Sequence, residues 1–330
     1  MKKMFPRDFA GSIALNGGTG GITSMCSLGD FAEMFKIDKT FVVKAPESVD
    51  PTRTDPNAPW VVSATSDIGS SNKIVARLLL QSDQILKGSA LGNGVDRNEI
   101  LKHMHTCKET LIECSAMADS IIKSIEEQVS IINNGKVSRS DGGRSINPFP
   151  HVENLKNKCS SFLVSANRYI RYISELPNMI IGLSDCDSNF EYLSKRLEKE
   201  VGINADITQY AKSMVGFTKR IIDLRNYDEH PKKKRTIIEN FKLMPNGTID
   251  APLWYIEGDE SNKPASINLS LSVFINNLLE LGEATFIITI MHQISKEYPY
   301  FIEMIPEQDV DEAIPIKYRL SLDASKIKFV

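Results

Sequence analysis

The sequence lacks the cysteine pattern of a disulfide-rich or zinc-binding protein. Its 330 residues include five cysteines, an odd number, and no two of them form a Cys-x-x-Cys pair. An odd count without paired spacing argues against a disulfide framework and against a zinc ribbon. We therefore expect reduced thiols, as in a cytoplasmic protein, and we expect no metal and no cofactor.

Long hydrophobic runs are also missing. The most strongly apolar stretch, Phe286–Met291, is far too short to cross a bilayer. No apolar run follows the opening Met-Lys-Lys, so the pattern of a signal peptide is not present. These observations predict a soluble, cytoplasmic protein with no membrane partner.

An excess of charge of one sign is lacking too. The net charge is −3, which gives no overall electrostatic attraction for nucleic acid, so any contact with RNA or DNA must be local. Hydrophobic residues make up 42% of the chain and charged residues 25%, close to globular averages, which excludes a disordered or fibrous protein. The length allows one large domain or two ordinary ones.

Residues 1–70 carry few structural signals. Four glycines between Gly17 and Gly21 lack the Gly-Lys-Ser/Thr of a phosphate-binding loop, so we interpret them as a loop. Four prolines between Pro46 and Trp60 indicate an extended connector. We therefore treat 1–70 as an N-terminal segment with a proline-rich connector.

Helical patterns dominate residues 71–231. Apolar residues recur three and four positions apart, which is the period of an amphipathic helix. The expected helices cover about 72–86, 96–132, 151–176, 188–200 and 205–229. Residues 133–150 are rich in Asn, Gly, Ser and Pro and indicate a surface loop.

Residues 232–330 carry a mixed pattern. Segments 236–244 and 248–257 are strand-like and flank Pro245-Asn246-Gly247, a typical hairpin turn. A helix is expected over 267–297, and strands over 300–305 and 315–322. The predicted fold class is mainly α: a helical bundle followed by a smaller α+β C-terminal part.

The helix expected over 205–229 has a charged residue in line with its apolar face, near its C-terminal end. Its apolar stripe runs through Ile207, Ala211, Met214, Thr218 and Ile221, and the next step of four reaches Arg225. An arginine in line with the apolar face of a helix needs an anionic partner or a functional role, because an unpaired buried charge is costly. His230 precedes Pro231, which disfavours helical geometry at His230 and predicts that the helix ends there.

Arg225, four intervening residues and His230 form a motif, with the polar Asn226 directly after the arginine. This segment resembles the Arg-x4-6-His motif of HEPN-domain ribonucleases, and the resemblance covers about residues 150–231. Two other arginines precede a histidine at similar spacing. Arg144 and His151 are separated by prolines that interrupt a helix. Arg97 and His103 lie at a helix start, where a cation is disfavoured.

The resemblance implies a metal-independent endoribonuclease that leaves 2′,3′-cyclic phosphate ends. In this hypothesis His230 is the general base or acid, Arg225 holds the phosphate, and Asn226 orients His230 or the phosphate. A basic run follows immediately and is expected to contact RNA: Lys232, Lys233, Lys234 and Arg235. The family also implies a homodimer with a composite site, and a defence or toxin–antitoxin setting.

Two other interpretations stay open: a HEPN-like fold without nuclease activity, and a helical protein unrelated to that family. Arg225 can pair with Glu229 one turn further along, and Lys219 with Asp223, while His230 is a solvated helix cap. The domain then serves binding or assembly without cleavage, because a fold does not establish an activity.

Other sequence features carry weaker signals. His103, His105 and Cys107 lie close together without a complementary ligand pair, so we expect ordinary side chains rather than zinc ligands. Trp254 and Tyr255 are able to stack on a base, but core packing is the better expectation.

Overall fold

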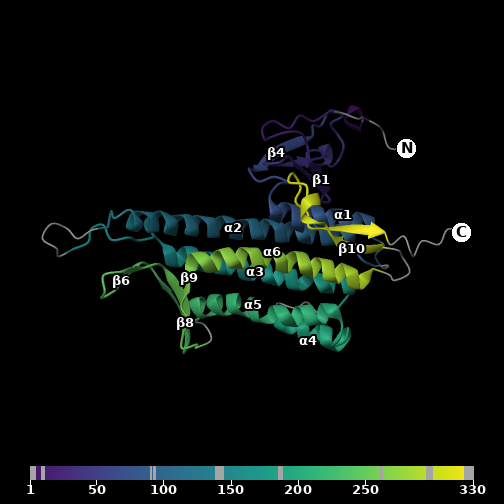
Figure 1. Cartoon of the computed structure of the whole chain (residues 1–330). Coiled ribbons are helices and arrows are strands. Elements are labelled where there is room, and N and C mark those ends of the chain that lie inside the picture. Colours follow the sequence, from purple (N-terminus) through teal and green to yellow (C-terminus); the bar gives the residue numbers. More distant parts are fainter. Residues whose placement is uncertain are drawn as a thin grey trace. The chain divides into compact units, whose positions relative to one another are not determined.

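The computed structural model describes residues 5–8, 12–89, 91, 94–137, 145–184, 189–260, 263–294 and 300–322. The chain divides into two compact units. Unit 1 comprises Met1–Lys108 and Thr289–Val330, and unit 2 comprises Glu109–Ile288. Helices α2 (Arg97–Asn133) and α6 (Ile267–Gln293) each contribute residues to both units (Figure 1). These units differ from the segments 1–70, 71–231 and 232–330, whose boundaries stay a prediction.

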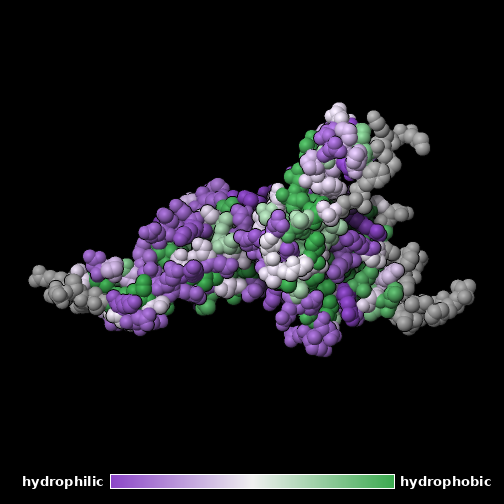
Figure 2. Space-filling view, turned by 90° about the horizontal axis from the view of Figure 1, so that it is seen from above, coloured by the Kyte–Doolittle hydropathy of each residue, from purple (hydrophilic) through white to green (hydrophobic). Residues whose placement is uncertain are grey.

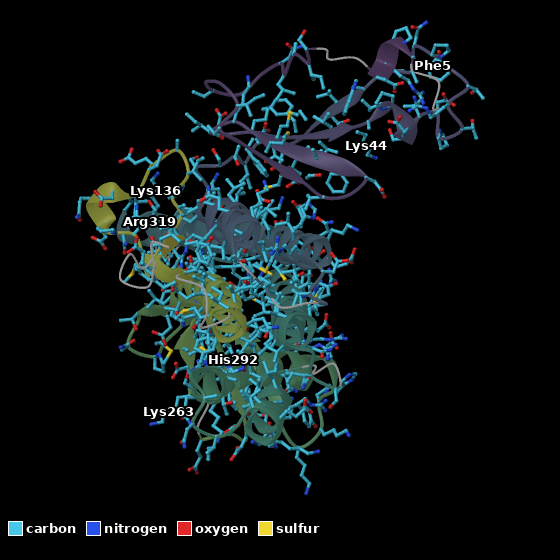
Figure 3. All side chains as sticks on the ribbon, turned by 90° about the vertical axis from the view of Figure 1, so that its right-hand side faces the viewer. Phe5, Lys44, Lys136, Lys263, His292 and Arg319 are labelled. Carbon is cyan, nitrogen blue, oxygen red and sulfur yellow. The ribbon has the colours of Figure 1, made fainter. Side chains whose placement is uncertain are left out.

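Unit 1 contains an antiparallel sheet that the sequence analysis did not predict. Four strands follow one another in chain order: β1 (Ser24–Ser27), β2 (Phe31–Phe35), β3 (Thr40–Lys44) and β4 (Val61–Ser66). Phe41 and Val43 alternate along β3 and are buried, as a strand with one covered face requires. Lys44, the last residue of β3, is labelled in Figure 3. The proline-rich segment joins β3 to β4 and holds a short 3-10 helix, η2 (Pro46–Ser48).

Side chains hold the loops of this sheet in place. Asp38 accepts hydrogen bonds from the backbone and hydroxyl of Thr19, at 2.7 and 2.6 Å, and so anchors the glycine-rich loop. Asp50 accepts the backbone N–H groups of Thr54 and Asp55, and it also pairs with Arg7 at 2.9 Å. These hydrogen bonds hold the pKa of Asp50 well below its usual range. Arg7 lies in a short 3-10 helix, η1 (Pro6–Asp8).

The rest of unit 1 joins a helical segment to a C-terminal hairpin. A π-helical turn, η3 (Val75–Leu80), leads into α1 (Gln81–Gly88). The hairpin pairs β10 (Tyr300–Met304) with β11 (Tyr318–Leu322), and the loop between them contains η4 (Glu307–Asp309). The buried side chain of Gln81 accepts the backbone N–H groups of Lys317 and Tyr318, both at 2.7 Å. Both strands expected at this end are confirmed, and Arg319 (Figure 3) pairs across them with Glu303.

Unit 2 is built on α3 (Leu155–Ile181), α4 (Phe190–Glu200) and α5 (Asp206–Glu229), with parts of α2 and α6. Asn189 begins α4 by accepting the N–H groups of Glu191 and Tyr192, as a helix N-cap does. Helix α5 packs against both α3 and α4 (Figure 1). The helices expected over these regions are confirmed, although α3 continues through Pro177 beyond its expected end.

A small sheet completes unit 2. Strands β5 (Arg235–Glu239), β8 (Leu253–Glu257) and β9 (Ala265–Ser266) pair in that order. The predicted turn joins the two-residue strands β6 (Lys242–Leu243) and β7 (Ile249–Asp250), with Gly247 at φ +86°. Trp254 on β8 is fully buried and packs on Phe274 of α6, with ring centroids 5.7 Å apart. Core packing of Trp254 is therefore confirmed, and base stacking by this residue is excluded.

The prediction of a mainly α fold is wrong. Over the described residues, the protein has six α-helices and four small sheets, with 51% helix and 16% strand, which is a mixed α+β fold. The difference arises largely in the first 70 residues. Their strands are four to six residues long, and their stability comes from pairing with one another rather than from a local pattern.

The face of the molecule that Figure 2 shows is mainly polar at its left end. Hydrophilic side chains predominate at the left of Figure 2, with smaller hydrophobic patches between them. Among the described helices, α6 alone has the length and apolar composition needed to span a membrane, and 61% of its apolar window is buried inside the protein. A buried core helix passes the same test, so this is weak support for a membrane segment.

Candidate functional site

Helix α5 carries the predicted site at its C-terminal end. Its buried face includes Ile207, Ala211, Thr218 and Ile221, as the apolar stripe predicts. The Thr236 hydroxyl donates to the carbonyl oxygen of Leu224 at 2.7 Å, which ties the end of α5 to β5. His230 is the C-cap, and its backbone N–H donates to the carbonyl oxygen of Asn226 at 2.8 Å. The expected helix end at His230 is confirmed.

Arg225 is held by its own helix. One terminal nitrogen, Nη2, forms an ion pair with the Glu229 carboxylate, and the other, Nη1, donates to Asn226 Oδ1 at 3.0 Å. The Arg225 side chain is 27% exposed, and its Nε is buried without an acceptor among the described residues. The pair with Glu229 that the sequence allowed is therefore present. Asn226 contacts Arg225 through its side chain and His230 through its backbone.

His230 is open to solvent. Its side chain is 70% exposed, and its Nε2 lies 3.9 Å from Glu229 Oε2. Glu229 thus lies between the guanidinium of Arg225 and the imidazole of His230. The structure brings the three predicted residues together at one helix end, with Glu229 as the group that links them.

The basic run divides into two pairs. Lys232 and Lys233 are exposed. Lys234 pairs with Asp259 at 2.9 Å, and Arg235 pairs with Glu257 at 2.6 Å. These hydrogen bonds raise the pKa of both Lys234 and Arg235. Two of the four residues expected to contact RNA therefore already have an anionic partner, and Lys232 and Lys233 remain the more accessible cations.

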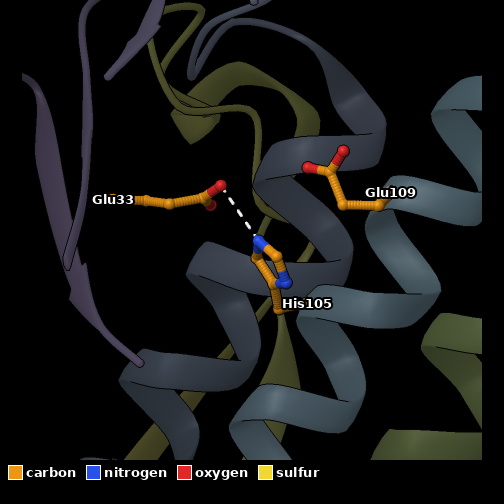
Figure 4. A group of neighbouring side chains, drawn as sticks. All are labelled: Glu33, His105 and Glu109. Atoms are coloured by element: carbon orange, nitrogen blue, oxygen red, sulfur yellow. Dashed lines mark hydrogen bonds and ion pairs between the residues drawn. The ribbon is translucent and has the colours of Figure 1, made fainter. Parts of the chain in front are cut away.

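The histidine cluster on α2 has a different role. His105 Nε2 lies 3.0 Å from Glu33 Oε1, and Lys108 Nζ lies 2.7 Å from Glu33 Oε2. Figure 4 shows Glu33 and His105, with Glu109 one turn further along α2. A metal ion bound to Glu33 and His105 would have to compete with the Lys108 ammonium. Cys107, which precedes Lys108 on α2, is buried.

No family model, no curated protein and no solved structure matches this chain.

Proposed function

We propose that the C-terminal end of α5 is a metal-independent RNA-cleaving site, with His230 and Arg225 as its working groups. The observation that carries the proposal is the position of His230. Its imidazole is 70% exposed, and Glu229 links it to the guanidinium of Arg225. Exposed Lys232 and Lys233 follow directly and supply positive charge for an RNA backbone. The resemblance to HEPN ribonucleases points to the same residues.

The reaction is a transesterification within the RNA. A general base removes the proton of a ribose 2′-OH, and the 2′ oxygen forms a bond to the adjacent phosphorus. The bond from phosphorus to the 5′ oxygen breaks, and a general acid protonates that oxygen. The products are a 2′,3′-cyclic phosphate and a 5′-OH. An imidazole suits both proton transfers because it titrates near neutrality.

Two such transfers call for two proton-carrying groups. A two-fold homodimer would place His230 from each copy at one composite site, which is the arrangement that the resemblance implies. Arg225 would then stabilise the charge that develops on the phosphate oxygens, because its planar fork matches a phosphate. In this proposal an incoming phosphate takes the place of Glu229 at Arg225.

The test is cleavage of labelled mixed-sequence RNA by the purified full chain in excess EDTA. We expect wild-type protein to leave 2′,3′-cyclic phosphate ends. His230→Ala should lose about 10²–10⁴-fold in rate, the usual contribution of one acid–base group. Arg225→Ala should lose about 10²–10³-fold, as expected on removing one charge-stabilising donor.

A matched control is His292→Ala. His292 is an exposed histidine near the end of α6, outside the proposed site. This variant should cleave as the wild type does. Equal cleavage by all four proteins, or no cleavage by any, would show that this site does not cleave RNA.

A second function, binding without cleavage, is favoured by one observation. The ion pair with Glu229 occupies Arg225, as in a purely structural helix end. Under this alternative, Lys232→Ala with Lys233→Ala weakens RNA binding while RNA stays intact. RNA binding that is unchanged in this double variant would show that RNA does not bind to this surface.

A further inference from the structure

Unit 2 has a polar pocket on the side of α5 away from its buried stripe. Gly216, Arg220, Asp223 and Tyr227 are spaced three or four residues apart, so they share one helix face. Asp259, which lies just after β8, also lines the pocket, together with Lys219 and Lys234. The pocket has a volume of about 500 Å³, which is within the range of small-molecule sites.

The charged groups of the pocket are paired with one exception. Lys219 lies 3.5 Å from Asp223, and Lys234 lies 2.9 Å from Asp259. Arg220 has no anionic partner among the described residues, and its Nε is buried without an acceptor. Two ion pairs and one further guanidinium leave the pocket with a net positive charge. A partly buried cation without a partner is unfavourable, and a bound anion would relieve that cost.

The surroundings of Arg220 leave room for an anion. Gly216 lies one turn before Arg220 on the same face, and a side-chain carbon added there would meet no atom within 4 Å. Lys234 also contributes a positive group, with Nζ 5.8 Å from the centre of the Tyr227 ring. A guanidinium binds a phosphate with two parallel hydrogen bonds, and flanking ammonium groups add charge without a fixed geometry.

From this pocket we infer that Arg220 binds the phosphate monoester group of a small phosphorylated ligand. A monoester carries about two negative charges near neutral pH, more than one phosphodiester of an RNA backbone. The pocket is separate from the Arg225 and His230 site, and the inference does not rest on RNA cleavage. The ligand class that fits the pocket is a small metabolite that carries this group.

The test is isothermal titration of the full chain with inorganic phosphate, with 5′-AMP, and with a short RNA bearing a 5′-hydroxyl. We expect saturable binding of phosphate and 5′-AMP, and weaker binding of the hydroxyl-ended RNA. Arg220→Ala should weaken binding of both phosphate ligands by about 10- to 100-fold, the usual effect of losing a hydrogen bond to a charged group.

Two further variants test whether phosphate binding depends on the pocket itself or only on the overall charge of the protein. Gly216→Leu fills the pocket while it keeps every charge, so it should abolish phosphate binding. Leucine favours a helix more than glycine, so this variant should unfold no earlier than the wild type. Arg171→Ala removes an exposed arginine from α3 and should bind as the wild type does.

The inference is overturned if either Arg220→Ala or Gly216→Leu binds phosphate as the wild type does. It is also overturned if wild-type protein binds neither phosphate ligand, or if the hydroxyl-ended RNA binds as tightly as 5′-AMP through Arg220. His230→Ala should keep phosphate binding. Failure of this inference is therefore distinguishable from failure of the proposed nuclease.

Discussion

A buried ion pair in unit 1 shows how single residues set local stability. Glu33 on β2 and Lys108 on α2 are both almost fully buried, at 3% and 1% exposure. Burial by itself raises the pKa of Glu33, but the hydrogen bond with His105 and the charge of Lys108 outweigh it and hold the pKa below 4.5. The two charges therefore stabilise each other.

Glu33→Gln should reduce the free energy of unfolding by about 3–5 kcal/mol at neutral pH, because it removes the carboxylate that lies 2.7 Å from the buried Lys108 ammonium. The measurement is urea unfolding followed by circular dichroism. The double variant with Lys108→Met should regain most of this loss. Glu99→Gln breaks an exposed pair with Lys102 on the same helix and should change little.

The effect should also depend on pH. Because the pKa of Glu33 is lowered by folding, its ionised form stabilises the protein above pH 4.5, and this contribution is lost as the pH falls through the folded-state pKa. The difference in the free energy of unfolding between wild type and Glu33→Gln should therefore become smaller below pH 4.5. A difference that stays constant into acid would contradict this role for Glu33.

At the scale of elements, an aromatic cluster joins a strand of the small sheet to a helix in unit 2. Phe274 on α6 lies between three rings, with centroid distances of 5.7 Å to Trp254, 6.1 Å to Phe217 and 6.5 Å to Phe162. These rings come from β8, α5 and α3. The β5–β8–β9 sheet therefore contributes to the core of unit 2, and its position supports the end of α5.

Trp254→Ala should lower the free energy of unfolding by about 3–5 kcal/mol, because it leaves a cavity beside Phe274 in this cluster. Tyr192→Ala removes an aromatic side chain that is 58% exposed in the same unit, and it should leave stability almost unchanged. Thermal unfolding of the two variants compares them directly. Similar losses of stability in both variants would show that the aromatic cluster around Phe274 contributes no more to stability than an exposed aromatic side chain does.

Element prediction succeeded where the signal was local. The 3-4 spacing of apolar residues and Pro231 predicted α5 and its end at His230, because both depend on neighbours within one helical turn. Pro245-Asn246-Gly247 predicted the turn between β6 and β7 for the same reason. The sheet β1–β4 was missed because its strands are short and depend on pairing with partners elsewhere in the chain.

For the whole molecule, the nuclease proposal requires two copies. One copy supplies one His230, whereas the reaction needs both a base and an acid. Light scattering should therefore give a mass of twice the 36.9 kDa of one chain. The cleavage rate per chain should fall on dilution below the dissociation constant of the dimer. A rate per chain that is unchanged in a monomeric preparation would contradict the composite site.

The sequence by itself determined the helices of unit 2 and the end of α5, and it allowed the pairing of Arg225 with Glu229, because these depend on residues within one or two turns of each other. It also left a solvated helix cap open as one interpretation of His230. Tertiary structure alone decided the N-terminal sheet, the burial of Lys108 against Glu33, and the pocket around Arg220. Each of these joins residues that are far apart in the chain, and their contacts depend on how the whole unit packs.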